Sequence, residues 1–143
     1  MSDVAQAVEP KERPIVPFLR LGEKPHLVGI RCGRCGATYL KGGRVACSKC
    51  GAVGDLEEIA LSNRGNLWVY SIVHQSAPGI PTPYVAAIVD LPEKVSVRCN
   101  LIDVEPDPAQ LSFGMPVEMV TQKVRTDKEG RDVIAFFFRP ARG

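Results

Sequence analysis

The 143-residue chain lacks any apolar run that approaches the roughly 20 residues of a membrane span. Its opening segment, MSDVAQAVEPKERP, lacks the apolar stretch of a secretory signal peptide. The chain also lacks a strong excess of either charge, because 18 Lys and Arg stand against 16 Asp and Glu. These absences argue against a membrane protein, a secreted protein and a nucleic-acid binder that acts through overall charge. We therefore expect a cytoplasmic globular protein.

Groups suited to catalysis are also scarce. Of the two histidines, His74 ends a strand-like segment beside a proline-rich loop, where a catalytic base could lie. However, no Ser or Cys in a nucleophile-like context accompanies it, and no carboxylate is poised to orient it. The chain has neither a Walker loop nor a G-x-G-x-x-G motif, and Gly42-Gly43 is only a turn signal. The sequence thus predicts no catalytic residues of its own.

Four of the five cysteines form two matching pairs. Cys32 and Cys35 are separated by two residues, as are Cys47 and Cys50, and a glycine follows each pair. This spacing lets both sulfurs of a turn reach one ion, and the glycine relaxes the backbone where amide groups fold over the sulfurs. In a reducing compartment such pairs indicate a metal site and not disulfides. Four thiolates favour Zn²⁺, with iron as the main competitor.

The predicted site holds one structural zinc ion per chain. Four protein ligands close the coordination sphere and leave no position for water or substrate. A module of roughly two dozen residues cannot bury enough apolar surface to order itself, so the metal supplies folding free energy. The fifth cysteine, Cys99, shares the apolar phase of its segment with Val97 and Leu101. We expect Cys99 to be a buried, inert thiol.

The rest of the chain has the pattern of β-strands. Residues 67–75 are rich in aromatic and β-branched residues, and residues 84–91 are nearly all apolar, as in a strand covered on both faces. Residues 95–101 alternate between apolar and polar, which predicts a half-buried strand. Residues 117–124 and 133–138 flank a charged turn and predict a hairpin. Five strands with this spacing fit a small barrel such as the OB-fold.

We expect a mainly β chain of three parts. Residues 1–26 form a polar, proline-rich arm in which Pro14, Pro17 and Pro25 leave room for only a short helical or extended segment. Residues 27–56 form a rubredoxin-like ribbon with the four cysteines. Residues 57–143 form the five-stranded OB-fold barrel, in which Pro108 favours one helical turn starting at Asp107.

A ribbon beside an OB-like barrel raises the possibility of single-stranded nucleic-acid binding. Proteins of that class display aromatic side chains on the strands together with a basic groove. Residues 51–143 instead hold nine Lys and Arg against twelve Asp and Glu, and their aromatic residues lie in apolar runs typical of a core or a protein interface. A nucleic-acid-binding module is therefore an alternative, as is a rubredoxin-like electron carrier with iron in the four-cysteine site.

An ordered set of motifs resembles a known family. The motifs are Arg31-Cys32-x-x-Cys35-Gly36, Cys47-x-x-Cys50-Gly51, Gly65-x-Leu67-Trp68-Val69-Tyr70-Ser71, Val73-His74, Pro78-Gly79, Pro83-Tyr84-Val85-Ala86, Asn100-Leu101, Gly114-Met115-Pro116-Val117 and Phe138-Arg139-Pro140-Ala141. Together they resemble the zinc-ribbon and OB-fold acyl-CoA-associated proteins, small partners of thiolase-superfamily enzymes that include benzoylsuccinyl-CoA thiolase. The chain departs from that family at Ser48, where relatives commonly carry proline.

The resemblance implies a function by association. It implies a hetero-oligomer, built around a thiolase dimer, in which a thiolase-like catalytic subunit carries the chemistry. The small subunit would stabilise that complex, border the substrate tunnel and share an acyl-CoA ligand with its partner, and we lean toward breakdown of an aromatic or bulky acyl-CoA. The residues expected to contact CoA or the partner are Arg34, Lys41, Arg44, Lys49, His74, Pro78, Gly79, Tyr84 and Asn100. For the four basic residues, plain solvation of the ribbon is an equal alternative.

Overall fold

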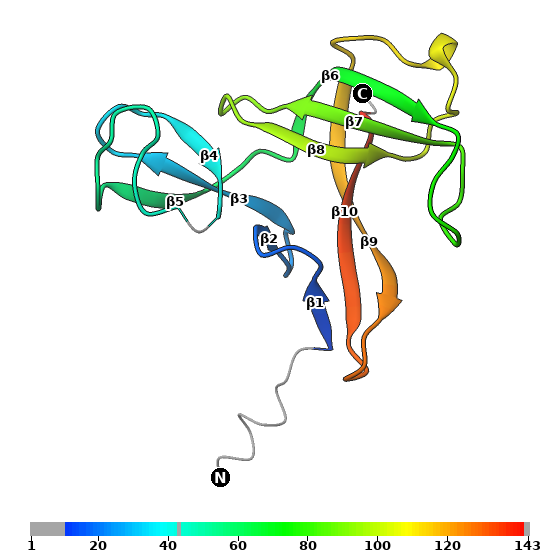
Figure 1. Ribbon diagram of the computed structural model, residues 1–143, viewed down its shortest axis with the longest axis horizontal. Helices are drawn as coiled ribbons and strands as arrows, with labels where there is room; N and C mark the ends of the chain where they lie inside the picture. The colour runs from blue at the N-terminus through cyan, green and yellow to red at the C-terminus, as the bar shows by residue number, and fades with distance from the viewer. Residues whose placement is uncertain (1–10, 43, 142–143) are drawn as a thin grey trace.

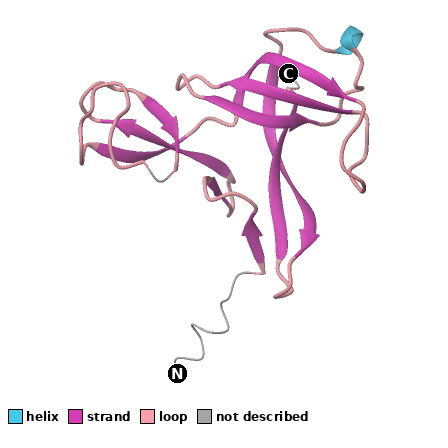
Figure 2. Cartoon of the chain, in the orientation of Figure 1, coloured by secondary structure: helices cyan, strands magenta, loops and turns pink. Residues whose placement is uncertain are grey.

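The computed structural model describes residues 11–42 and 44–141, and within them every regular element but one is a strand (Figure 2). The strands are β1 Glu12–Pro14, β2 Leu19–Arg20, β3 His26–Cys32, β4 Thr38–Leu40, β5 Leu56–Ala60, β6 Arg64–Val73, β7 Tyr84–Asp90, β8 Ser96–Leu101, β9 Pro116–Thr126 and β10 Asp132–Pro140. The exception is the 3₁₀ turn η1, Pro108–Gln110, which lies where the sequence predicts one helical turn. The Asp107 carboxylate caps it by accepting a hydrogen bond from the Ala109 N–H. The mainly β prediction is confirmed, and none of these elements is a helix able to cross a membrane.

Strands β6 to β10 close into a barrel. Neighbouring strands follow the order β6-β7-β8-β10-β9, and β9 pairs with β6 to complete the circle. The β8–β10 pair is parallel and the other barrel pairs are antiparallel. This is the Greek-key arrangement of an OB-fold, as predicted. The β9–β10 hairpin also extends well beyond the barrel, and β1 pairs with its far end (Figure 1).

In strands β7 and β8 of the barrel, only one face is completely buried. On β8, Val97, Cys99 and Leu101 are buried while the alternate residues are exposed, which confirms the predicted half-buried strand. Strand β7 alternates as well, because Tyr84, Ala86 and Ile88 are half-buried between fully buried neighbours. The prediction that β7 is covered on both faces is therefore wrong for the described chain alone. The described residues do not fully cover the second face of β7, the face that carries Tyr84, Ala86 and Ile88.

The cysteine ribbon is built on β3. This strand pairs with β2 near its start, with β4 on one edge and with β5 on the other. The expected domain boundary after residue 56 falls at the first residue of β5, which pairs with β3 along its whole length. Because Leu19 and Leu27 pack into the same buried cluster as Val97 and Phe138, the ribbon base and the barrel share one core. The arm is extended and not helical where it is described, since it contributes β1 and β2.

A buried carboxylate fastens the arm to the β9–β10 turn. The Asp127 side chain is only 5% exposed, and it accepts hydrogen bonds from Arg13 Nε at 2.7 Å and from Arg131 Nε at 3.1 Å. The backbone N–H groups of Glu129 and Arg131 also donate to it. Burial raises the pKa of Asp127, but the Arg13 and Arg131 donors outweigh this effect and lower it to about 2.

We expect Asp127→Asn to lower the midpoint of thermal unfolding by several degrees at pH 7, because Arg13 and Arg131 both lose the buried carboxylate that they share. The folded-state pKa lies below 3.8, the ordinary pKa of an aspartate, so the carboxylate contributes its full stability above about pH 4 and loses it as the pH falls toward 2. The difference between the two proteins should shrink over that window. Differential scanning calorimetry of both proteins from about pH 2 to about pH 7 measures this difference in unfolding midpoint. Glu129→Gln, in the same turn but 68% exposed, should change little, and an equal loss there would contradict the assignment.

Candidate functional site

The four paired cysteines converge on one point at the tip of the ribbon. Cys32 and Cys35 lie in the turn between β3 and β4, and Cys47 and Cys50 lie in a second turn closed by the Ala46–Val53 bridge. All four sulfurs lie within 4.8 Å of one another, with Sγ–Sγ distances of 3.7 Å between Cys32 and Cys50 and 3.5 Å between Cys35 and Cys47. A tetrahedral ion with metal–sulfur bonds of about 2.3 Å needs sulfur–sulfur edges of about 3.8 Å. The four residues therefore fit one tetrahedral metal ion.

The two cysteine turns repeat the same local geometry. In the first, Gly36 N–H donates to the Cys32 carbonyl at 2.9 Å, and in the second, Gly51 N–H donates to the Cys47 carbonyl at 2.8 Å. Both glycines have positive φ, 80° and 78°, which explains why glycine follows each pair. The chain thus forms each half of the site locally, and only the folding of the ribbon brings the halves together.

Hydrogen-bond donors surround the two buried sulfurs, those of Cys32 and Cys47. Backbone N–H groups of Cys35 and Arg34 lower the pKa of Cys32. The Tyr39 hydroxyl and then the Cys50 N–H lower the pKa of Cys47 to about 5. At Cys50, the Ala52 N–H lowers the pKa, but burial and the neighbouring thiols raise it to about 11. Three or four thiolates this close repel one another, and a bound cation is the group that relieves the repulsion.

Tyr39 on β4 is part of this site, although no motif in the sequence indicates it. Its hydroxyl lies 3.5 Å from Cys47 Sγ and accepts a hydrogen bond from Ser48 Oγ at 3.1 Å, so its own proton is free to point at the sulfur. The Arg44 guanidinium lies 4.0 Å from the centroid of the Tyr39 ring. Tyr39 thereby connects a candidate metal ligand to one of the four basic residues expected to contact CoA.

The basic residues around the turns divide into two groups. Lys41 Nζ lies 2.6 Å from a Glu58 carboxylate oxygen, and Arg44 lies over Tyr39, so both make contacts within the chain. Arg34 and Lys49 are exposed and occupy matching positions, each just before the second cysteine of its pair. The structure therefore leaves Arg34 and Lys49 exposed, and it holds Lys41 and Arg44 in contacts within the chain.

A second feature lies on the barrel, where three of the remaining predicted residues meet. Gly79, Tyr84 and Asn100 line a groove of about 940 Å³ between the β6–β7 loop and the β9–β10 hairpin. His74 and Pro78 are exposed and are not among the residues that line it. Sequence reasoning missed Arg98, Arg125 and Phe137, which complete the groove, because they come from strands far apart in the chain. Cys99 lies beneath the groove, and burial raises its pKa to about 12, as expected of an inert thiol.

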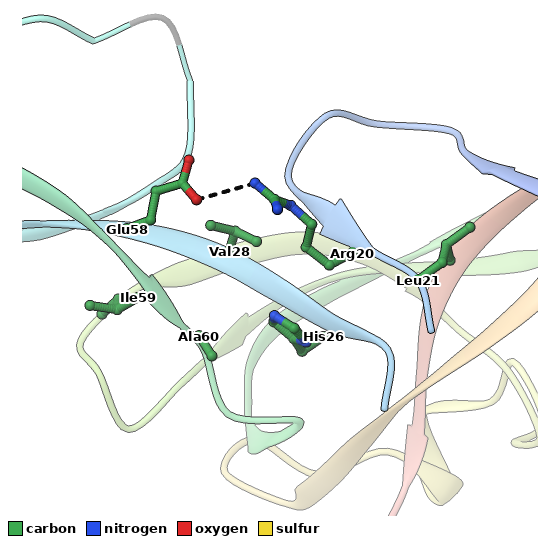
Figure 3. Close-up of a pocket in the computed structure, with 7 residues that line it drawn as sticks. All are labelled: Arg20, Leu21, His26, Val28, Glu58, Ile59 and Ala60. Atoms are coloured by element: carbon green, nitrogen blue, oxygen red, sulfur yellow. Dashed lines mark hydrogen bonds and ion pairs between the residues drawn. The ribbon is translucent and has the colours of Figure 1, made fainter. Parts of the chain in front are cut away.

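A smaller hollow of about 390 Å³ lies between β2, β3 and β5 (Figure 3). Arg20 and Glu58 form an ion pair across it at 3.1 Å, and His26 Nδ1 donates to the Lys24 carbonyl. Glu58 also forms an ion pair with Lys41. Its carboxylate on β5 therefore connects the arm, through Arg20, with the end of β4, through Lys41. The charges of this hollow are paired with each other and offer no free group for chemistry. In the described part of the chain, neither histidine bonds a Ser, Cys or carboxylate.

Known proteins are similar to this chain in sequence and in fold. Residues 58–122 match the profile of the ChsH2 C-terminal OB-fold domain. A DUF35 domain-containing scaffold protein of Methanocaldococcus jannaschii is 33% identical over 121 residues, an alignment that covers 82% of this chain and 84% of that protein. The chain belongs to the DUF35 family. The resemblance seen in the sequence motifs is thereby confirmed.

Two further relatives of this DUF35 protein have names that mention an enzyme. The benzoylsuccinyl-CoA thiolase subunit BbsA of Thauera aromatica is 28% identical over 148 residues, which cover 97% of this chain and 99% of that protein. A solved structure, described as an Ltp2-ChsH2(DUF35) aldolase, matches with a TM-score of 0.60 and 28% identity over 80% of this chain and 84% of that one.

If the four thiols share one ion, Cys47→Ala should reduce bound metal from about one equivalent per chain to near zero. Cys99→Ala, at the fifth cysteine, should retain the full equivalent. Inductively coupled plasma mass spectrometry of both purified proteins measures the content. Circular dichroism of each variant separates loss of the ion from loss of the whole fold, since the barrel core is a different buried cluster from the one around the cysteines. An unchanged metal content in Cys47→Ala would contradict the site.

Proposed function

We propose that this DUF35 protein is a non-catalytic, metal-bearing subunit of a cytoplasmic acyl-CoA thiolase or acyltransferase complex. The observation that carries the proposal is the alignment with BbsA, a benzoylsuccinyl-CoA thiolase subunit, from one end of both chains to the other. The lack of a nucleophile–base pair in the described residues is consistent with it. The catalytic groups then belong to a thiolase-like partner, which this chain stabilises and whose CoA and substrate tunnel it borders.

Within this proposal the four-cysteine site holds a structural zinc ion. Four cysteines are the ligand set of closed zinc sites, and the same set also binds iron. Cys32, Cys35, Cys47 and Cys50 would fill the coordination sphere, which leaves the ion only a role in shape. Metal analysis distinguishes the two ions, because an iron–thiolate protein is coloured and a zinc protein is colourless. Iron would favour the alternative of an electron carrier.

The exposed pair Arg34 and Lys49 suits the phosphates of CoA. Each side chain projects from a turn fixed by two candidate metal ligands, so the backbone that carries it is already ordered before the side chain meets an anion. The barrel groove, in contrast, offers apolar surface to a protein neighbour or to a bulky acyl group. An aromatic or otherwise bulky acyl-CoA is the substrate class that we favour, because the aligned relative acts in a benzoylsuccinyl-CoA thiolase.

The proposed function predicts that the chain co-purifies with a thiolase-type protein encoded beside it. Co-expressed, the tagged chain should retain that protein through affinity and size-exclusion steps, and the pair should cleave or form an acyl-CoA carbon–carbon bond. The chain alone should have no thioester activity. A neighbour that is fully active and does not associate would refute the proposal.

If the ribbon borders the CoA site, Arg34→Glu combined with Lys49→Glu should raise the KM of the complex for its acyl-CoA about tenfold, with a smaller change in kcat. The reason is that two charge-assisted contacts to phosphate are reversed while the partner's catalytic groups stay in place. Lys24→Glu, exposed at the other end of β3, is the control and should leave KM unchanged. Equal KM values for the wild type, the double variant and the control would mean that the ribbon does not border the CoA site. Arg34 and Lys49 would then only solvate the ribbon.

A further inference from the structure

The floor of the barrel groove is the outer face of two central strands. Tyr84 and Ala86 come from β7, and Arg98 and Asn100 from β8. The β6–β7 loop and the β9–β10 hairpin project from the same side of the barrel and form its walls (Figure 1). Strand β7 is apolar on both faces, a pattern typical of a strand with cover on each side. The described chain covers only the inner face, so this outer face is suited to a partner.

Exposed apolar side chains from three distant segments meet in the groove. Ile15 follows β1 and is 41% exposed, Ile80 lies in the β6–β7 loop and is 49% exposed, and Val124 lies on β9 and is 44% exposed. Single exposed apolar residues are ordinary, but a contiguous patch inside a groove marks an interaction site. Pro81, beside Ile80, stiffens the loop, so that it loses little entropy on docking.

The charge of the groove restricts what it can bind. Among the described residues, its two charged lining residues are both arginines, Arg98 and Arg125, and no carboxylate lines it. Both arginines are exposed. A partner segment that packs on the apolar wall therefore binds more favourably if it also places acidic side chains near Arg98 and Arg125.

A second copy of the chain is a poor occupant. In a two-fold dimer the same patch faces itself, so the arginines of one copy would approach the arginines of the other without a carboxylate from the groove between them.

Single-stranded nucleic acid is a poor occupant as well, even though OB-folds bind it on this face. Bases need exposed aromatic rings to stack on. Here Tyr84, Phe136 and Phe137 are half-buried, and the most exposed apolar lining residues are aliphatic.

We propose that this groove is the docking site for an apolar segment of the thiolase-type catalytic subunit, with acidic side chains of that segment paired to Arg98 and Arg125. The inference rests on the proposed function and adds to it the surface and the chemistry of the contact. The ribbon is then left free to face the CoA site, while the outer face of β7 and β8 holds the partner.

The test uses the full chain co-expressed with the thiolase-type protein encoded beside it. Two variants address the two halves of the contact: Ile80→Asp adds a carboxylate to the apolar wall, and Arg98→Glu with Arg125→Glu reverses its charge. Each should lower the amount of partner retained per chain at least about tenfold, and the charge variant should lose more at low salt than at high salt. The matched controls are Phe113→Asp, an apolar position 73% exposed outside the groove, and Lys94→Glu in the β7–β8 turn.

The outcomes separate the two proposals. If the wild-type chain retains the partner and the groove variants retain it equally well, the docking site is elsewhere and the proposed function stands. If the wild-type chain retains no partner, the proposed function fails and this inference fails with it. Circular dichroism and metal content of each variant verify that it folds. Binding of a fluorescent oligothymidine by the wild-type chain, lost in the arginine variant, would reassign the groove to nucleic acid.

Discussion

The ribbon depends on the convergence of four cysteine sulfurs, because it has almost no apolar core of its own. The buried cluster around the site consists of Cys32, Cys47 and Ala52, with a few half-buried neighbours. So small a cluster cannot offset the entropy of ordering two turns and three short strands. The donors from the backbone and from Tyr39 favour ionised sulfurs, and the distances between the sulfurs suit one ion. We therefore attribute the shape of this half of the molecule to the four-cysteine site.

The barrel is stabilised by a buried apolar core, and the base of the ribbon packs into the same core. Leu27, near the start of the strand that ends in Cys32, is buried with the barrel residues. A rigid β3 therefore links the candidate metal site to the barrel core. The arm adds a second link, since β1 pairs with β10 and Arg13 reaches the Asp127 carboxylate. A module that docks on one protein while it borders a ligand needs this fixed geometry between its two halves.

The two halves also present different surfaces. The ribbon displays Arg34 and Lys49 on turns, whereas the barrel displays an apolar groove with two arginines on its floor and rim. Of the nine residues expected to contact CoA or a partner, Gly79, Tyr84 and Asn100 meet in that groove, and Lys41 and Arg44 make contacts within the chain instead. Family motifs identify residues that matter together, but they do not distinguish a residue that faces outward from one that holds another in place.

The sequence by itself determined the four candidate metal ligands and the class of fold. Cysteine spacing and the following glycines act within one turn, and strand periodicity acts within one strand, so both can be read without knowing the distant parts of the chain. Only the tertiary structure decided that Tyr39 touches Cys47, that Glu58 holds Lys41, and that Ile15, Ile80 and Val124 meet in one groove. These contacts join residues whose separation along the chain carries no signal, because barrel closure and ribbon pairing bring them together. The outer face of β7 was predicted only in part. Its apolar pattern predicted that another element covers this face, and the fold revealed that the described chain leaves it only half-buried.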